Sequence, residues 1–186
     1  MHQRSYLVFQ SESQQVPFTF LYPAGWQARE IVGEDGVEVF IAGPCNQENT
    51  YTVSFSVRFS SAPETPEAAM ATFLERYRQA PDFCEIGRAS GMVASHPAIE
   101  VEITYTMPLP LNSLNLQLKI IRERRICFKN DNSLIELIYT APDEMFNTWL
   151  PDFRTLVQTF TLPVEPIDAV FYPLISVPGE ASITAR

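Results

Sequence analysis

One nine-residue segment limits what this chain can fold into. Apolar and polar residues alternate along it without interruption: Tyr51, Thr52, Val53, Ser54, Phe55, Ser56, Val57, Arg58 and Phe59. Successive side chains of a β-strand point to opposite faces, so this pattern predicts a strand with one buried and one polar face. It also places Tyr51 on the buried face together with Val53 and Phe55. The segment therefore predicts a sheet that is covered on at least one side.

Other segments show strand and hairpin patterns. Gly33-Glu34-Asp35-Gly36 separates the apolar stretches 26–31 and 37–42, and Asp-Gly is a typical hairpin turn because its residues tolerate positive φ. The segment 134–140 is apolar on both faces apart from Glu136, which predicts a central strand. We expect further strands at residues 6–11, 18–22, 84–93, 99–105 and 116–128. Short turns between them favour antiparallel pairing.

Two segments have helical periodicity. The first covers about residues 65–80, with Thr65 as its N-cap, and the second covers about residues 142–160. Pro151 lies inside the second segment and removes a backbone donor, so we expect a kink or a restart near Leu150.

These elements predict one α+β domain, which fits a chain of 186 residues. The expected architecture is an α/β/α sandwich with a central, mostly antiparallel sheet and the two helices described above. The domain is expected to span residues 1–162, and residues 163–186 form a proline-containing C-terminal tail or arm. Strands and helices do not alternate along the sequence, so it does not indicate a doubly wound nucleotide-binding fold.

The tail contains four prolines and an apolar, strand-like stretch from Val170 to Val177. Such a stretch can pack on a sheet edge of its own domain. It can equally add to a neighbouring chain, which would give a homodimer through residues 163–186. The sequence leaves both alternatives open.

Core and turn residues in this order resemble the PsbP-like family, over roughly residues 6–162. The matching residues are Phe18-x-Phe20-x-Tyr22-Pro23-x-x-Trp26, Gly36-x-x-Val39-Phe40, the strand 98–105, Tyr139-Thr140-Ala141-Pro142, Phe146, Phe153, Val157 and Thr159-Phe160. The resemblance implies an α/β/α fold with a central antiparallel sheet, which DcrB-type bacterial envelope proteins share. Members of the family bind larger assemblies and have no reaction in common, so it also implies a protein partner.

The charge balance argues against two classes of partner. The chain has 13 Lys and Arg against 22 Asp and Glu, a net charge of −9, whereas nucleic acid and anionic lipid attract positive surfaces. The sequence contains no run of about 18 apolar residues, so we expect no membrane insertion. The first residues show no secretory-signal pattern, so we expect a cytoplasmic protein, with a mature exported fragment as the alternative.

No familiar catalytic pattern is present. The only histidines are His2 and His96, and neither belongs to a zinc-binding motif; we expect His96 to be an exposed turn residue. Cys84 and Cys127 are expected to be buried in strands, and Cys45 to be exposed in a loop. Trp26 and Trp149, both on apolar faces, are expected to pack in the core. We therefore expect no catalytic residue, no metal site and no cofactor.

The basic cluster Arg122-Glu123-Arg124-Arg125 allows two interpretations. The arginines can bind an anionic partner, or they can pair across strands with glutamates, which we favour. Strand alternation places Arg122 and Arg124 on one face and Arg125 on the other. The glutamates available for such pairs are Glu100, Glu102 and Glu136.

The same glutamates support a different function. Glu100 and Glu102 point the same way from a strand, and a carboxylate in a cleft can act as an acid or base. Three hypotheses follow. The first is a non-enzymatic binding or assembly module with an unknown partner; the second is a small-ligand-binding protein or hydrolase that uses these carboxylates; the third is an arm-exchanged homodimer with a structural role.

Overall fold

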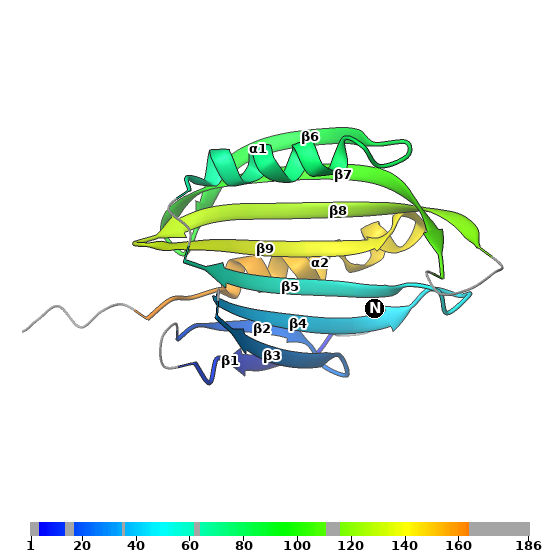
Figure 1. Cartoon of the computed structure of the whole chain (residues 1–186). Helices are drawn as coiled ribbons and strands as arrows, with labels where there is room; N and C mark the ends of the chain where they lie inside the picture. Colours follow the sequence, from blue (N-terminus) through cyan, green and yellow to red (C-terminus); the bar gives the residue numbers. More distant parts are fainter. Residues whose placement is uncertain (1–3, 14–16, 35, 62–63, 111–115, 164–186) are drawn as a thin grey trace, which may run out of the picture.

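The computed structural model describes residues 4–13, 17–34, 36–61, 64–110 and 116–163 (Figure 1). Over these residues, a seven-stranded antiparallel sheet has the strand order β3-β4-β5-β9-β8-β7-β6. Its strands are β3 (Gln27–Gly33), β4 (Gly36–Cys45), β5 (Thr52–Ser60), β6 (Cys84–Val93), β7 (His96–Leu109), β8 (Gln117–Asn130) and β9 (Ser133–Pro142). The central position of β9, between β5 and β8, confirms the prediction made from its two apolar faces.

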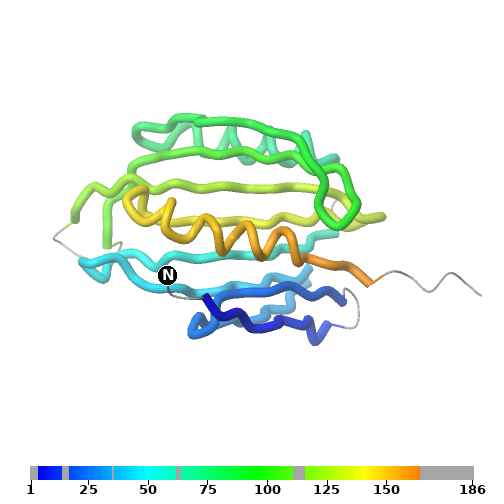
Figure 2. The backbone as a smooth tube through the Cα atoms, turned by 180° about the vertical axis from the view of Figure 1, so that it is seen from behind, coloured from blue at the N-terminus to red at the C-terminus, as the bar shows by residue number. Residues whose placement is uncertain are grey.

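Each face of the sheet is partly covered by a different helix. Helix α1 (Pro66–Tyr77) packs against β7 and β8 on one face. Helix α2 (Asp143–Thr159) lies on the opposite face beside a two-stranded hairpin of β1 (Tyr6–Gln10) and β2 (Thr19–Pro23), as Figures 1 and 2 show. The described residues thus form the expected α/β/α sandwich. We refer to the two sides of the sheet as the α1 face and the α2 face.

Both helices begin where the sequence indicates. The Thr65 side chain accepts a hydrogen bond from the backbone N–H of Ala68 at 3.2 Å and caps α1. Helix α2 continues through Pro151, so the expected restart near Leu150 is wrong. Pro151 has no backbone N–H, so the carbonyl of Asn147 loses its helical hydrogen bond. Both residues are exposed, so water can donate to that carbonyl instead. None of the helices in the described ranges is long and apolar enough to cross a membrane.

The larger hydrophobic core lies between the sheet and α2. The alternating residues Val53, Phe55, Val57 and Phe59 all point into it, as their spacing predicts. The rings of Trp26 and Trp149 meet edge to face with centres 5.2 Å apart, which confirms their packing role. A second core lies under α1. It contains Met70, Phe73, Leu74, Val101, Ile103, Tyr105, Leu109, Ile121, Cys127 and Leu134.

The first strand is tied to the last helix by a buried carboxylate. Asp152 on α2 is fully buried, forms an ion pair with Arg4 and accepts a hydrogen bond from the hydroxyl of Tyr6 at 2.9 Å. Thr161, just after α2, pairs with Thr19 at the start of β2. The proposed tail, residues 163–186, lies outside the described residues except for Pro163.

Candidate functional site

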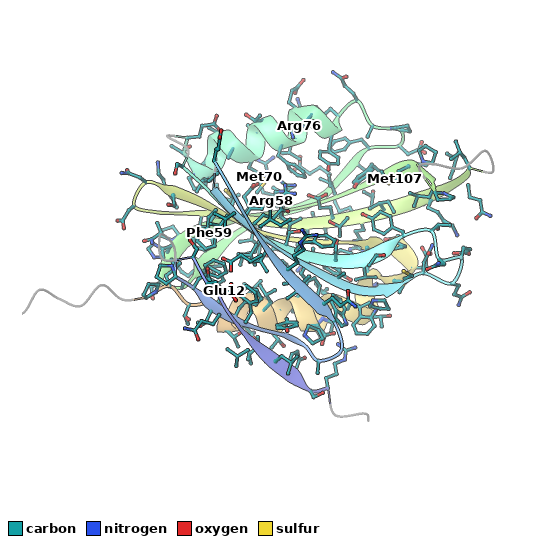
Figure 3. All side chains as sticks on the ribbon, turned by 60° about the horizontal axis from the view of Figure 1, so that its bottom comes forward. Glu12, Arg58, Phe59, Met70, Arg76 and Met107 are labelled. Atoms are coloured by element: carbon teal, nitrogen blue, oxygen red, sulfur yellow. The ribbon has the colours of Figure 1, made fainter. Side chains whose placement is uncertain are left out.

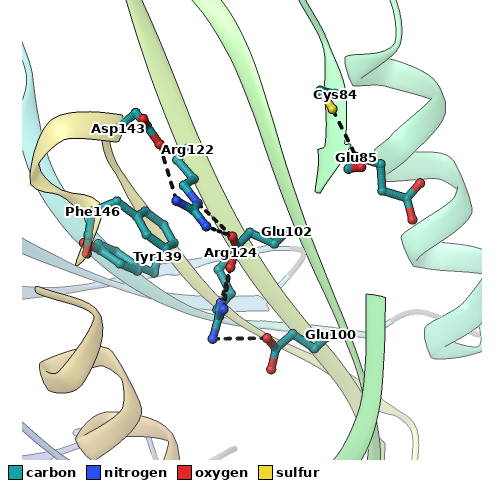
Figure 4. Close-up of polar contacts among 9 residues, drawn as sticks. All are labelled: Cys84, Glu85, Glu100, Glu102, Arg122, Arg124, Tyr139, Asp143 and Phe146. Atoms are coloured by element: carbon teal, nitrogen blue, oxygen red, sulfur yellow. Dashed lines mark hydrogen bonds and ion pairs between the residues drawn. The ribbon is translucent and has the colours of Figure 1, made fainter. Parts of the chain in front are cut away.

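The α2 face of β7 and β8 carries an ion-pair cluster, drawn in Figure 4. Glu102 is 5% exposed and accepts hydrogen bonds from Nε of Arg122 and Nε of Arg124, both at 2.7 Å. Arg124 also pairs with Glu100 at 3.2 Å, and Arg122 lies over the Phe146 ring at 4.5 Å. The cluster is therefore a ladder of paired charges across two neighbouring strands.

This pairing sets the chemistry of Glu102. Burial alone would raise the pKa of its carboxyl, but the hydrogen bonds and charges of Arg122 and Arg124 outweigh burial and hold the pKa below its ordinary value. Glu136 lies on the opposite face, where it binds Nη1 of Arg125 at 2.7 Å. The three glutamates do not converge in one cleft, and all are ion-paired, as the favoured interpretation of the arginines predicts.

On the α1 face, Arg125 binds two glutamates next to helix α1. Its guanidinium donates to Glu123 through Nε and Nη2, at 3.1 and 2.8 Å, besides its bond to Glu136. Burial would lower the pKa of Arg125, but the two carboxylates raise it above its ordinary value. The sequence grouped Glu123 with the basic cluster and gave no sign that this glutamate is 3% exposed.

Beside α1, where the helix no longer covers the sheet, the α1 face is hollowed. We call this cavity of about 200 Å³ the tyrosine hollow. Figure 3 locates Arg58 of β5 at this part of the sheet. The hollow is lined by Phe40, Tyr51, Ser54, Ser56, Arg58, Tyr77, Tyr105, Glu123, Arg125, Ile138 and Thr140.

The three tyrosines of the hollow are electrostatically linked to Glu123. Burial is the first cause that raises the pKa of Tyr51, Tyr77 and Tyr105, and the negative charge of Glu123 is the second. The Tyr77 and Tyr105 rings lie with their centres 4.9 Å apart, and both line the hollow together with Glu123. The phenols therefore stay protonated and surround a buried carboxylate.

Tyr51 corrects the sequence analysis, which placed it on the face of Val53 and Phe55. It precedes β5, which begins at Thr52, and it packs with the core under α1. Tyr51 lies outside the strand, and its backbone N–H and carbonyl pair with Asn46, so the alternation of β5 does not extend back to it. Its side chain lines the hollow.

The predicted cysteine and histidine positions are partly wrong. Cys84 is exposed instead of buried, because it begins β6, an edge strand whose residues are exposed up to Met92. Cys127 is buried as expected, and burial raises its pKa to about 12. His96 is half-buried and stacks on the Phe128 ring with centres 6.1 Å apart. In the described ranges, no three His, Cys, Asp or Glu side chains gather as a metal site would require.

Solved structures resemble this fold over most of the chain. PA94 of Pseudomonas aeruginosa, a protein of unknown function, has a TM-score of 0.55 at 14% identity and covers 86% of this chain and 98% of its own. CyanoP, the PsbP of Synechocystis sp. PCC 6803, has a TM-score of 0.51 at 14% identity, with coverages of 84% and 92%.

LpqN of Mycobacterium tuberculosis, described as involved in cell envelope biogenesis, has a TM-score of 0.52 at 10% identity, with coverages of 86% and 92%. No family model matches the sequence, and no curated protein matches it either. At these identities the likeness concerns the fold alone. The chain therefore has the PsbP-like fold, as its core and turn residues imply.

Proposed function

We propose that this chain is a non-enzymatic binding module that docks a protein partner on the open part of its α1 face. The observation that carries the proposal is the state of Ser54 and Ser56, which line the tyrosine hollow at 9% and 7% exposure. Among the described residues, neither hydroxyl has a hydrogen-bond partner. No buried side-chain oxygen or nitrogen of the described residues lacks a partner, so both hydroxyls open into the hollow, where a bound group can reach them.

The state of the three candidate catalytic glutamates favours a binding function over a hydrolase. Glu100, Glu102 and Glu136 are each held by arginine, and the pKa of Glu102 is lowered rather than raised. A general acid near neutral pH needs the opposite shift. The solved structures with this fold have descriptions that name no common reaction, so the fold itself predicts none.

Site-specific photo-crosslinking tests this proposal. We would place p-benzoylphenylalanine at Phe40, which is 38% exposed at the hollow, and at the control position Leu118, which is 75% exposed on the α2 face. After irradiation in the native cell, the Phe40 variant should form one defined adduct with another protein, and the Leu118 variant should not. Equal adducts from both positions, or none from Phe40, would contradict the proposal. An adduct of twice the chain mass would support the homodimer instead.

A further inference from the structure

The floor of the tyrosine hollow is a trough of small residues between larger ones. Ser56 lies between Phe40 on β4 and Ile138 on β9, which are its partners in the two neighbouring strands. Ser54 lines the hollow two residues earlier on β5, opposite Thr140 on β9. Both serine hydroxyls open into the trough. A side chain inserted between Phe40 and Ile138 can therefore reach them.

The charged groups around the hollow offset one another. Arg58 donates from Nε to Glu38 at 2.8 Å. Arg125 binds both Glu123 and Glu136. The lining itself holds two arginines and one glutamate, a net charge of +1, and the bonded Glu38 and Glu136 just outside it change the net charge to −1. A charged group that enters would lose water without finding an unpaired counter-charge.

An apolar occupant fits the trough poorly as well. It would remove water from the hydroxyls of Ser54 and Ser56 and offer no hydrogen bond in return, which is unfavourable for a polar group. The cavity of about 200 Å³ is also small. Pockets for small-molecule ligands have volumes of roughly 300–1,000 Å³. These limits favour one neutral side chain that both donates and accepts hydrogen bonds.

A carboxamide matches the spacing of the two hydroxyls. Ser54 and Ser56 are two residues apart on one face of β5. Strand geometry separates such side chains by about 6.4–6.8 Å. The oxygen and nitrogen of a carboxamide lie about 2.3 Å apart, as standard bond lengths require, and hydrogen bonds of about 2.9 Å at both ends extend its reach to about 8 Å. One carboxamide can thus accept from one serine and donate to the other.

An apolar groove continues from the hollow. It has a volume of about 430 Å³ and runs between the end of α1 and the end of β7, which Figure 3 marks with Arg76 and Met107. Tyr77 and Tyr105 line both the groove and the hollow. A segment whose side chain enters the hollow can therefore place a neighbouring apolar side chain in the groove.

We propose that the hollow binds the carboxamide of a glutamine side chain from the partner, and that the groove holds an apolar side chain beside that glutamine. This inference rests on the proposed function and names the chemistry of the partner segment. Glutamine fits because its carboxamide is neutral, donates and accepts, and stands on an apolar stem that can pass between Phe40 and Ile138. Glutamate has nearly the same shape but carries a charge, and methionine has a similar length without the polar group.

Peptide titrations followed by NMR test the inference on the full chain. The probes are acetyl-Leu-Gln-Leu-amide and its glutamate and methionine counterparts. The glutamine peptide should bind about tenfold more tightly than either, since leaving a polar group unpaired costs roughly that factor. The double substitution Ser54→Ala and Ser56→Ala should abolish the preference for glutamine over methionine. This variant should fold, because it removes no side-chain hydrogen bond between the described residues.

A control and a competing ligand sharpen the test. Ser90→Ala makes the same change on the exposed edge strand β6 and should leave both preferences unchanged. Equal affinity for the glutamine and methionine peptides, tighter binding of the glutamate peptide, or a glutamine preference that survives the double serine variant would overturn the inference. So would propionamide binding as tightly as the glutamine peptide, because the ligand would then be a small amide.

The crosslinking experiment separates this inference from the proposed function. If the probe at Phe40 still captures a protein at full yield in the double serine background, the binding module stands and the glutamine site fails. Loss of that adduct in this background alone would support both. Absence of the adduct even with both serines in place contradicts the proposed function itself.

Discussion

The guanidinium of Arg125 lies over the ring of Phe73, 3.9 Å from its centre, and so joins strand β8 to helix α1. The same guanidinium holds Glu123 and Glu136 on the sheet. Its side chain is 12% exposed, which makes it the most enclosed arginine of the ion pairs described above. Arg125 therefore connects the helix, the sheet and the wall of the tyrosine hollow.

Replacing Arg125 by alanine should destabilise the protein strongly. The substitution leaves Glu123 buried without its counter-charge, and breaking a buried pair in this way costs about 3–5 kcal/mol. Urea denaturation measures the loss in the free energy of unfolding. The control is Arg88→Ala, because Arg88 pairs with Glu85 on an exposed edge strand and should lose less than about 1 kcal/mol. Similar losses in the two variants would contradict the assigned role.

Glu102 should make the protein sensitive to acid. Its pKa in the folded state is held below the ordinary value of 4.5, so the folded state favours the ionised form more than the unfolded chain does. The stability this provides is present above pH 4.5 and is lost as the pH falls through the folded-state pKa. The difference in unfolding free energy between the wild type and Glu102→Gln should therefore be constant near neutral pH and shrink below about pH 4.5. A difference that stays constant down to pH 3 would exclude this linkage.

The sheet faces were predictable because they follow from local alternation. The division of Arg122 and Arg124 from Arg125 needs only the two-residue period of a strand, and the glutamate partners lie on the neighbouring strands β7 and β9. Tyr51 shows where this reasoning stops. It immediately precedes β5, which begins at Thr52, and the alternating pattern alone does not show that the strand starts one residue later than the pattern does.

The tyrosine hollow was not predictable for a related reason. Its wall combines Phe40, Tyr77, Tyr105 and Glu123, which are far apart in the sequence and meet only through the strand order and the position of α1. Each looked like an ordinary core or surface residue within its own element. The exposure of Cys84 likewise depends on β6 being an edge strand, which is a property of the whole sheet.

Thiol labelling should distinguish the three cysteines. Cys45 and Cys84 are exposed, whereas Cys127 is buried with its pKa raised to about 12, so it holds almost no reactive thiolate near neutral pH. Ellman's reagent should titrate two thiols quickly in the native protein and the third only after unfolding. Cys84→Ser should remove one of the fast thiols. Three fast thiols in the native protein would contradict the burial of Cys127, and a Cys84→Ser variant that keeps two fast thiols would contradict the edge position of β6.

The hairpin between β3 and β4 should tolerate a methyl group at one glycine and not at the other. Gly36 has φ +148°, and a Cβ there would lie 1.8 Å from the carbonyl oxygen of Phe59 on β5. Gly36→Ala should therefore lower the free energy of unfolding by about 3 kcal/mol or more, through strain and displacement of the neighbouring strand. Gly33→Ala is the matched control, because its Cβ would approach nothing closer than 3.8 Å and should cost less than about 0.5 kcal/mol. Equal stability of the two variants in urea denaturation would show that β4 and β5 do not pair in the register that brings Gly36 opposite Ser60.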